Sequence, residues 1–176
     1  APLERGRPDH LGRAQVRRAV AQCSDPNALI QALSGGRMIA AQSYLPVEHP
    51  LYNSQVATYL FDPQAATDRL QAVGWLDLDG NPATPRTALG VAGVPDGSAF
   101  TVDYLVSPDA QSQGAAQQIQ AWLADCGIQA NLVVQDPQVS LAAGPEGPVF
   151  GRQFDLAQFA WVTTLEPLCN LYITNE

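Results

Sequence analysis

Apolar residues recur at helical spacing near the start of the chain. Between Asp9 and Cys23 they stand at i, i+3, i+4 and i+7, as on the buried face of a helix: Val16, Ala19, Val20 and Cys23. Asp is a residue type that caps helix N-termini, so the helix is predicted to begin at Asp9. Arg13, Arg17 and Arg18 fall on the other side, and we interpret them as a solvated face rather than a clamp for an anion.

Two further helices are predicted from one local motif, an acidic capping residue followed by proline. Asp25-Pro26 begins one helix, which Gly35-Gly36 ends, and Asp62-Pro63 begins the other. Proline suits the first helical turn because an N–H at that position has no partner within the helix. The pattern predicts a helical corner over residues 9–35 and a helix over residues 62–74.

Two stretches rich in proline and glycine lack any periodicity. Residues 38–60 include Tyr44-Leu45-Pro46 and are predicted to form an extended loop, and residues 77–97 an exposed flap. The flap opens with Asp77-Leu78-Asp79-Gly80-Asn81, which resembles the start of a calcium-binding loop. Its glycine stands fourth rather than sixth, and Leu89 occupies the place of the bidentate Glu. We therefore interpret this segment as a turn.

The second half of the chain alternates between strand and helix patterns. Residues 100–106 and 128–134 read as strands, the first with Phe100, Val102, Tyr104 and Val106 on one face. Between them, Ser107-Pro108 is expected to begin a helix with a buried side made of Ala115, Ile119, Trp122, Leu123 and Cys126. This order predicts a βαβ unit with parallel strands over residues 100–134. A third strand is predicted over residues 154–162, where the nearly continuous apolar run is typical of burial on both faces.

Composition narrows the classes of function. The 176 residues are 46% hydrophobic and 15% charged, which excludes a disordered chain and suits one ordinary domain. Nine basic and seventeen acidic residues give a net charge of −8, which disfavours binding to nucleic acid or to an anionic membrane surface. No apolar stretch approaches the ~20 residues that span a bilayer, so membrane insertion by this segment is not predicted.

The cysteines leave two interpretations open. Cys23, Cys126 and Cys169 form no Cys-x-x-Cys pair, and no histidine stands near them, so neither a zinc site nor any other cofactor is predicted. They are either small buried apolar residues or, in an extracytoplasmic protein, one disulfide and a cysteine left over. The spacing does not decide which pair would bond.

Groups suited to catalysis are few. The chain has two histidines and no lysine, and His49 stands in a proline-flanked loop without a partner nearby in sequence. Paired carboxylates occur only at Asp77 and Asp79, on the predicted turn. We therefore predict that the protein is not an enzyme.

The end of the third predicted strand is the expected ligand site. There the apolar run Phe159-Ala160-Trp161-Val162 gives way to Thr163-Thr164. Ligands of open α/β sheets collect beyond the carboxyl ends of the strands. Trp161 either stacks on a ligand or fills the core. We predict one set of ligand-binding residues, with Tyr44 added from the proline-rich loop: Trp161, Val162, Thr163, Thr164 and Tyr44.

Several short motifs follow one another in a recognisable order. Residues 16–30 resemble a "V-R-x-A … D-x-x-A-L/I" helical corner, and residues 59–66 a "Y-x-Y-D-P-x-x-A" helix start. Residues 72–75 are similar to "A-G-Y/W", residues 119–128 to "I-Q-x-x-L … G-I", and Phe154-Asp155 with Trp161 to "F-D … W". Together, over about residues 13–172, these motifs resemble the family 5 extracellular solute-binding proteins, the peptide- and nickel-type receptors of ABC importers.

The resemblance implies a fragment of the second of two lobes, with a periplasmic-binding-protein-like fold of class II. It implies a secreted protein, in the periplasm or at the cell surface and usually lipid-anchored, that binds a solute such as a peptide and delivers it to an ABC permease. Peptide-binding members carry a "W-x-x-D" motif whose Asp receives the peptide's α-amino group. The aligned residue here is Thr164, whose hydroxyl cannot form that charge-assisted bond, although Glu166 could substitute if the chain bends differently.

The predicted fold class is α/β: a single domain over residues 1–176, forming a partial ligand-binding lobe with a small mixed sheet and a βαβ unit flanked by helices. Two alternatives remain. One is a self-contained α/β enzyme that uses Asp77, Asp79 or His49. The other is an interaction module that binds a protein partner through the loops of residues 38–60 and 77–97.

Overall fold

The computed structural model describes residues 8–160 and 165–166. Its helices and strands alternate along the chain in the order α1 (Ala14–Cys23), α2 (Pro26–Ser34), α3 (Pro63–Ala72), β1 (Trp75–Leu76), β2 (Thr87–Ala88), β3 (Thr101–Val106), α4 (Ala110–Asp125), β4 (Gln129–Val134), α5 (Pro137–Ser140) and β5 (Leu156–Ala157). The fold is therefore α/β, with the helices mostly in the first half and the main sheet in the second, as predicted.

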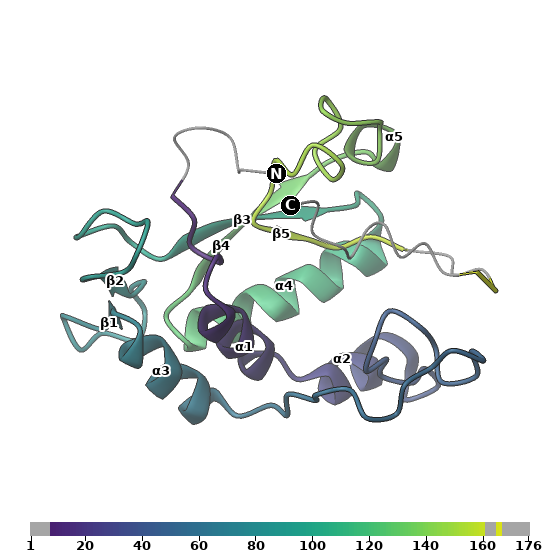
Figure 1. The fold of residues 1–176 in the computed structure, drawn as a ribbon, viewed down its shortest axis with the longest axis horizontal. Helices are drawn as coiled ribbons and strands as arrows, with labels where there is room; N and C mark the ends of the chain where they lie inside the picture. Colours follow the sequence, from purple (N-terminus) through teal and green to yellow (C-terminus); the bar gives the residue numbers. More distant parts are fainter. Residues whose placement is uncertain (1–7, 161–164, 167–176) are drawn as a thin grey trace.

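The main sheet has three strands in the order β4-β3-β5, and both neighbours run parallel to β3. Tyr104 at its centre stands opposite Leu132 on one side and Leu156 on the other. Within the described residues, β1 and β2 form a short antiparallel ribbon, which an isolated antiparallel bridge between Thr87 and Ala99 extends. This ribbon lies at the far end of the molecule from α2 (Figure 1). The predicted βαβ unit with parallel strands is confirmed.

Helix ends follow the local signals in most places. The side chain of Asp25 accepts hydrogen bonds from the N–H groups of Asn27 and Ala28, and Gly35 ends α2 with φ 59°. Asp62 caps α3 through the N–H of Ala65. The cap of α4 is Asp109 rather than the predicted Ser107, because Asp109 accepts the N–H of Ser112. These caps satisfy N–H groups that the first turn of a helix leaves unpaired.

Helix α1 begins at Ala14 and not, as predicted, at Asp9. The reason is a tertiary contact of the preceding segment. His10 Nδ1 donates to the carbonyl oxygen of Thr101 at 2.8 Å, and its ring packs edge-on against Trp75 and Phe100. A chain held against the sheet in this way cannot wind into the helix, so the capping signal at Asp9 is overridden.

The core lies where α1, α3 and α4 meet the sheet. Trp75 and Phe100 stack with ring centroids 4.1 Å apart at its centre, and both side chains are fully buried. The residues around them come from α1, α3, β3, α4 and β4 or stand next to these elements, whereas α2 contributes no fully buried residue. They are Val16, Ala19, Cys23, Ala66, Leu70, Val102, Tyr104, Val106, Ala116, Leu123, Cys126, Ile128 and Ala130. On α4 the buried set differs from the predicted one, because Ile119 and Trp122 are only partly buried while Ala116 is fully buried.

A disulfide joins Cys23 at the end of α1 to Cys126 at the end of α4, with their Cα atoms 6.3 Å apart. Both residues are fully buried. The bond answers the question that the sequence left open for these two cysteines, and Cys169 lies outside the described residues. Because it closes a long loop between the first helix and the βαβ unit, the disulfide removes much conformational freedom from the unfolded chain.

Arg86 connects the flap to the end of α4. Its Nε donates to the carbonyl oxygen of Cys126 at 2.9 Å, and its Nη1 donates to that of Trp75 at 3.3 Å. Its main-chain N–H donates to Gly127 and its carbonyl accepts from Phe100. A cation at the C-terminal end of a helix also interacts favourably with the helix dipole. Burial lowers the pKa of Arg86, and the charges of Asp77 and Asp68 oppose that shift.

The loop of residues 38–60 agrees with prediction, but the exposed flap and the third strand do not. Residues 77–97 contain β2 and three buried core residues, Ala88, Val91 and Val94. Residues 38–60 contain no helix or strand, and the Asp77–Asn81 segment is a turn in which Asp77 and Asp79 accept main-chain N–H groups. The described part of the third strand is short and only partly buried, and Phe159 is 40% exposed. Burial on both faces is therefore wrong for residues 154–160, none of which is fully buried. Within the described residues β5 is also an edge strand, since it pairs with β3 alone. Residues 161–162 of that prediction lie outside the described chain.

Removing the disulfide should lower stability substantially. Cys23 and Cys126 are 103 residues apart, and closing a loop of that length lowers the entropy of the unfolded chain by an amount equivalent to about 4–5 kcal/mol. We expect the double variant C23A/C126A to lose about 2–5 kcal/mol in urea unfolding followed by circular dichroism. The matched control C169A should unfold like the parent protein. Equal stability of the parent and the double variant would contradict a disulfide between Cys23 and Cys126.

Gly127 should tolerate no side chain. Its φ is 77°, and an added Cβ would lie 2.7 Å from Cγ of Arg86. We expect G127A to destabilise the protein by about 1–3 kcal/mol through strain and displacement of Arg86. The control is G35A, because Gly35 also has a positive φ but nothing lies within 4 Å of the added carbon. Equal losses in thermal unfolding would show that backbone strain alone acts at Gly127.

Candidate ligand-binding edge of the sheet

The three parallel strands end at one edge of the sheet. β3 ends at Val106, β4 at Val134 and β5 at Ala157. Because parallel strands share a direction, the segments that follow these residues gather on the same side. Ligands of open α/β sheets bind at this edge. It is therefore the first place to seek a binding site in this fold.

Helix α4 begins at this edge, directly after β3. Asp109 is its cap and accepts the N–H of Ser112 at 2.8 Å. The pKa of Asp109 lies below its ordinary value because the main-chain N–H and the hydroxyl of Ser112 both donate to the carboxylate. The charged form is thus maintained at neutral pH. A carboxylate in this place occupies the first turn of the helix, where an anionic ligand would otherwise be favoured.

Gln158, just beyond β5, is held by two contacts to β3. Its main-chain N–H donates to the carbonyl oxygen of Leu105 at 2.9 Å, and its side-chain Oε1 accepts from the hydroxyl of Tyr104 at 2.7 Å. Burial raises the pKa of Tyr104 to about 12, so the hydroxyl stays protonated and remains a donor. The side-chain amide of Gln158 is therefore held in a defined position at the edge. Its role was missed from sequence, although a buried tyrosine needs a partner for its hydroxyl.

Paired contacts between Asp155 and Asp103 start β5 alongside β3. Asp155 Oδ2 accepts the N–H of Asp103 at 2.8 Å, and the N–H of Asp155 donates to the Asp103 carbonyl at 3.2 Å. The side chain of Asn131, from β4, donates to Asp103 Oδ1 at 3.4 Å. These contacts align the three strands and so determine where the residues after Ala157 leave the sheet.

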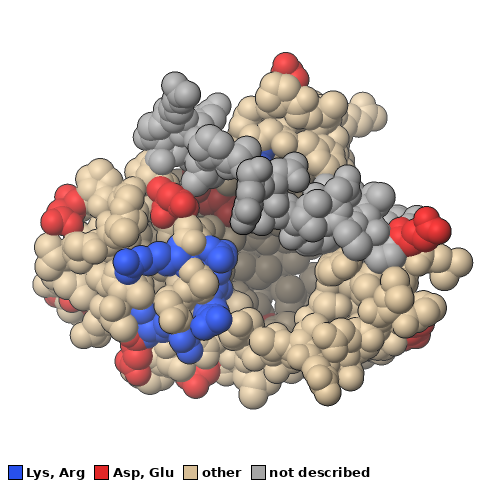
Figure 2. Space-filling view, in the orientation of Figure 1, with Lys and Arg blue, Asp and Glu red and all other residues tan. Residues whose placement is uncertain are grey.

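Four of the five predicted ligand-binding residues cannot be placed. Trp161, Val162, Thr163 and Thr164 lie outside the described residues, although the chain leads towards them directly from β5. Tyr44 lies in the loop between α2 and α3 and is 44% exposed. In the space-filling view, the surface is hollowed over α4, between α1 and this loop (Figure 2). The grouping of Tyr44 with Trp161–Thr164 stays a prediction.

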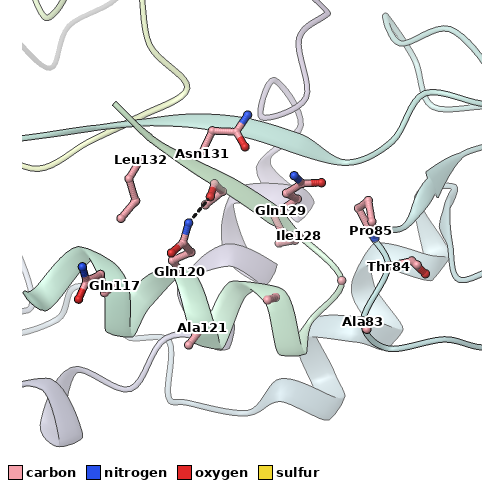
Figure 3. A pocket seen from close by; sticks show the side chains of 13 residues that line it. Ala83, Thr84, Pro85, Gln117, Gln120, Ala121, Ile128, Gln129, Asn131 and Leu132 are labelled. Atoms are coloured by element: carbon pink, nitrogen blue, oxygen red, sulfur yellow. Dashed lines mark hydrogen bonds between the residues drawn. The ribbon is translucent and has the colours of Figure 1, made fainter. Parts of the chain in front are cut away.

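Two grooves lie elsewhere on the described surface. The larger, of about 770 Å³, runs between α4 and the first residues of β4, at the opposite end of that strand. Figure 3 shows Gln117 and Ala121 of α4 on one side, Gln129 and Asn131 on the other, and Gln120 bonded to the Ala130 carbonyl at 2.6 Å. No charged residue lines it. A smaller groove of about 310 Å³ lies between the α1–α2 corner and residues 57–61.

The residues considered for catalysis have local roles. Asp79 accepts the Asn81 N–H and the Thr84 hydroxyl, which lower its pKa, and Asp77 accepts the Gly80 N–H. His49 Nδ1 accepts the Leu51 N–H within its own loop. In the described parts of the chain, no three His, Cys, Asp or Glu side chains gather where they could hold a metal ion. Over the same residues, none of the helices has the length and hydrophobicity needed to cross a membrane.

The described fold is similar to several solved structures. The oligopeptide-binding protein of Thermus thermophilus, complexed with a pentapeptide, has a TM-score of 0.75 at 22% identity, over 90% of this chain and 26% of that one. AppA of Bacillus subtilis, an oligopeptide-binding protein in complex with a nonapeptide, has a TM-score of 0.70 at 17% identity, over 87% and 29%. MelB of Agrobacterium fabrum, in complex with stachyose, has a TM-score of 0.67 at 23% identity, over 82% and 21%.

The chain spans about a quarter of the length of these proteins, and the likeness shows a periplasmic-binding-protein-like fold. A comparison with curated protein sequences gives no match. The family model described as "Bacterial extracellular solute-binding proteins, family 5 Middle" matches residues 7–174, nearly the whole chain. The chain therefore belongs to the bacterial extracellular solute-binding proteins of family 5.

Proposed function

We propose that this chain is part of one ligand-binding lobe of an extracytoplasmic receptor that delivers an oligopeptide to an ABC importer. The observation that carries the proposal is the family match over residues 7–174. In this proposal the ligand binds at the carboxyl edge of the sheet, against Trp161–Thr164 and Tyr44. The chain acts as a binding protein and catalyses no reaction.

An exposed apolar loop supports a lobe that works against another surface. Residues 38–61 carry half of the large apolar side chains that are exposed in the described structure: Met38, Ile39, Tyr44, Val47, Leu51, Tyr59, Leu60 and Phe61. Large apolar side chains exposed in such number along one loop favour an interaction site. We attribute these exposed apolar side chains to contact with the ligand or with the remaining part of the receptor. The Thermus thermophilus protein is about four times as long as the part of it that matches this chain.

The peptide assignment rests on the ligands of similar structures. Two of the similar structures hold peptides, and one holds stachyose. By the resemblance, Thr164 aligns with the Asp that receives the peptide's amino group in peptide-binding members, and Glu166 is the nearby carboxylate that could substitute for it. A saccharide is the second candidate ligand, favoured by the stachyose complex and by the uncharged residues Thr163 and Thr164.

The chain of 176 residues should bind its ligand only weakly. One lobe encloses a ligand on one side, and pockets that bind tightly bury most of the ligand's surface. We expect titration calorimetry with penta-alanine or stachyose to give a Kd no tighter than about 1 µM, equivalent to about −8 kcal/mol. A nanomolar Kd would contradict the proposal that a second lobe is needed. Binding of stachyose alone would overturn the peptide assignment and retain the receptor.

A carboxylate at position 164 should improve peptide binding. We expect T164D to bind penta-alanine about tenfold or more tightly than the parent, because a hydrogen bond to a charged group contributes about 1.5–3 kcal/mol. The gain should vanish for N-acetylated penta-alanine, which has no charged amino group. The matched control T163D adds the same charge at the neighbouring position. If T163D gains as much, or the acetylated peptide gains too, position 164 is not the amine site.

A further inference from the structure

Four of the nine basic residues gather on one face of this acidic protein. Arg13, Arg17 and Arg18 belong to α1 or its cap, and Arg69 belongs to α3, which packs against it. Figure 2 shows the positive side chains clustered over these two helices, with acidic side chains beside the cluster and towards the periphery of the view. We name these four residues the basic face. Its sign is opposite to the net charge of −8 of the whole chain.

The helical positions explain the shape of the basic face. Ala14, Arg17, Arg18 and Ala21 stand at i, i+3, i+4 and i+7, and all four are exposed on the side of α1 that points away from the core. Because alanine side chains are short, the surface over the two alanines is shallow, and the longer arginine side chains flank it. The result is a shallow strip with positive charge along it rather than an enclosed pocket.

Carboxylates do not neutralise the basic face within the described structure. Nη1 of Arg17 donates to the carbonyl oxygens of Leu11 and Gly12 at 2.9 and 2.6 Å. Arg69 donates from Nε to Gln22 Oε1 at 3.0 Å and from Nη1 to Gln15 Oε1 at 3.1 Å. Neutral acceptors fix these two guanidinium groups but leave their positive charge uncompensated, and each group keeps further N–H donors.

The acidic residues nearest in sequence do not change this balance. Asp68 Oδ1 accepts from the side-chain amide of Gln64 at 2.8 Å. Neither Asp9 nor Asp68 forms an ion pair with Arg13 or Arg18 in the described chain, where these two arginines also have no hydrogen bond from their side chains. Arg13 and Arg18 are thus available to an outside partner without loss of an internal contact.

We propose that the basic face docks an acidic segment of another polypeptide, one that carries several carboxylates. Charge complementarity supports this partner, since arginine forms paired, charge-assisted hydrogen bonds with carboxylates. Arg69 is already oriented by Gln15 and Gln22, so less side-chain entropy is lost on binding. The inference does not depend on the proposed transport function.

The same surface is poorly suited to an anionic membrane. Helices that lie on membranes carry large apolar residues beside the basic ones, whereas no large apolar side chain is exposed on α1 or α3. Charges interact across about 8–10 Å at physiological salt, so a short acidic segment would be attracted mainly by the local arginines. An extended membrane surface would also face the acidic remainder of the protein.

The test uses a fluorescein-labelled peptide of twelve residues with four Glu, and its counterpart with Gln in place of each Glu. Anisotropy is measured at low salt with the parent chain, with R13E/R18E and with the matched control R37E/R152E. The control alters the net charge equally at exposed arginines outside the basic face. Circular dichroism checks that each variant is folded. In a separate experiment, binding of the parent chain to vesicles containing phosphatidylglycerol is measured.

We expect the parent to bind the Glu peptide and not the Gln peptide, R13E/R18E to weaken binding about tenfold or more, and R37E/R152E to change it less than about twofold. Salt at 0.5 M should abolish the interaction, because exposed charges are then screened over a few ångströms. Equal weakening by both variants would overturn the proposal, since net charge alone would explain it. Absence of binding by the parent, or preference for the vesicles, would also overturn it.

Discussion

Strand β3 hydrogen-bonds to β4 on one side and to β5 on the other, and both partners run parallel to it. This pairing places the carboxyl ends of all three strands at one edge, where the chain leaves β5 towards Trp161. It also requires a crossover between β3 and β4, and α4 provides it. The position of the candidate ligand-binding edge is therefore a consequence of strand direction, before any side chain at the edge is considered.

The other helices reach this sheet through a small number of long-range contacts. Trp75 and Phe100 stack in the core, Cys23 is bonded to Cys126, and Arg86 joins the flap to the end of α4. Each contact links a segment of the first half of the chain to the βαβ unit. Together they make one body from two parts that have separate sequence patterns. The loop of residues 38–61 contacts this body at Phe61, whose ring centroid lies 6.3 Å from that of Trp122, and it buries Leu45, but eight of its large apolar side chains stay exposed.

The proposed function and the proposed docking of an acidic segment would use two different surfaces. The hollow over α4 and the exposed loop suit contact with a ligand or with further chain, while the basic face of α1 and α3 is available to a separate partner. The two surfaces differ in chemistry, one apolar and the other charged. Association at the first surface would therefore depend on apolar burial, and association at the second would depend on salt.

The sequence alone was sufficient for features that depend on neighbours along the chain. The caps at Asp25 and Asp62, the turn at Asp77–Asn81 and the parallel βαβ unit all follow from local hydrogen-bonding needs and from the spacing of apolar residues. The order of short motifs also indicated the family, because a family's motifs survive as local patterns. For the candidate site, sequence reasoning predicted the edge and the residues Trp161–Thr164, which lie outside the described chain.

Only the tertiary structure decided which distant residues meet. The spacing of three cysteines is compatible with several pairings, and the packing of α1 against α4 selects Cys23 and Cys126. The start of α1 moved from Asp9 to Ala14 because His10 packs against Trp75 and Phe100, and Gln158 gained its role from the hydroxyl of Tyr104. Such contacts join residues that are far apart in sequence. The energies of such contacts depend on the positions that the whole fold gives to both residues. The propensities of neighbouring residues therefore do not predict them.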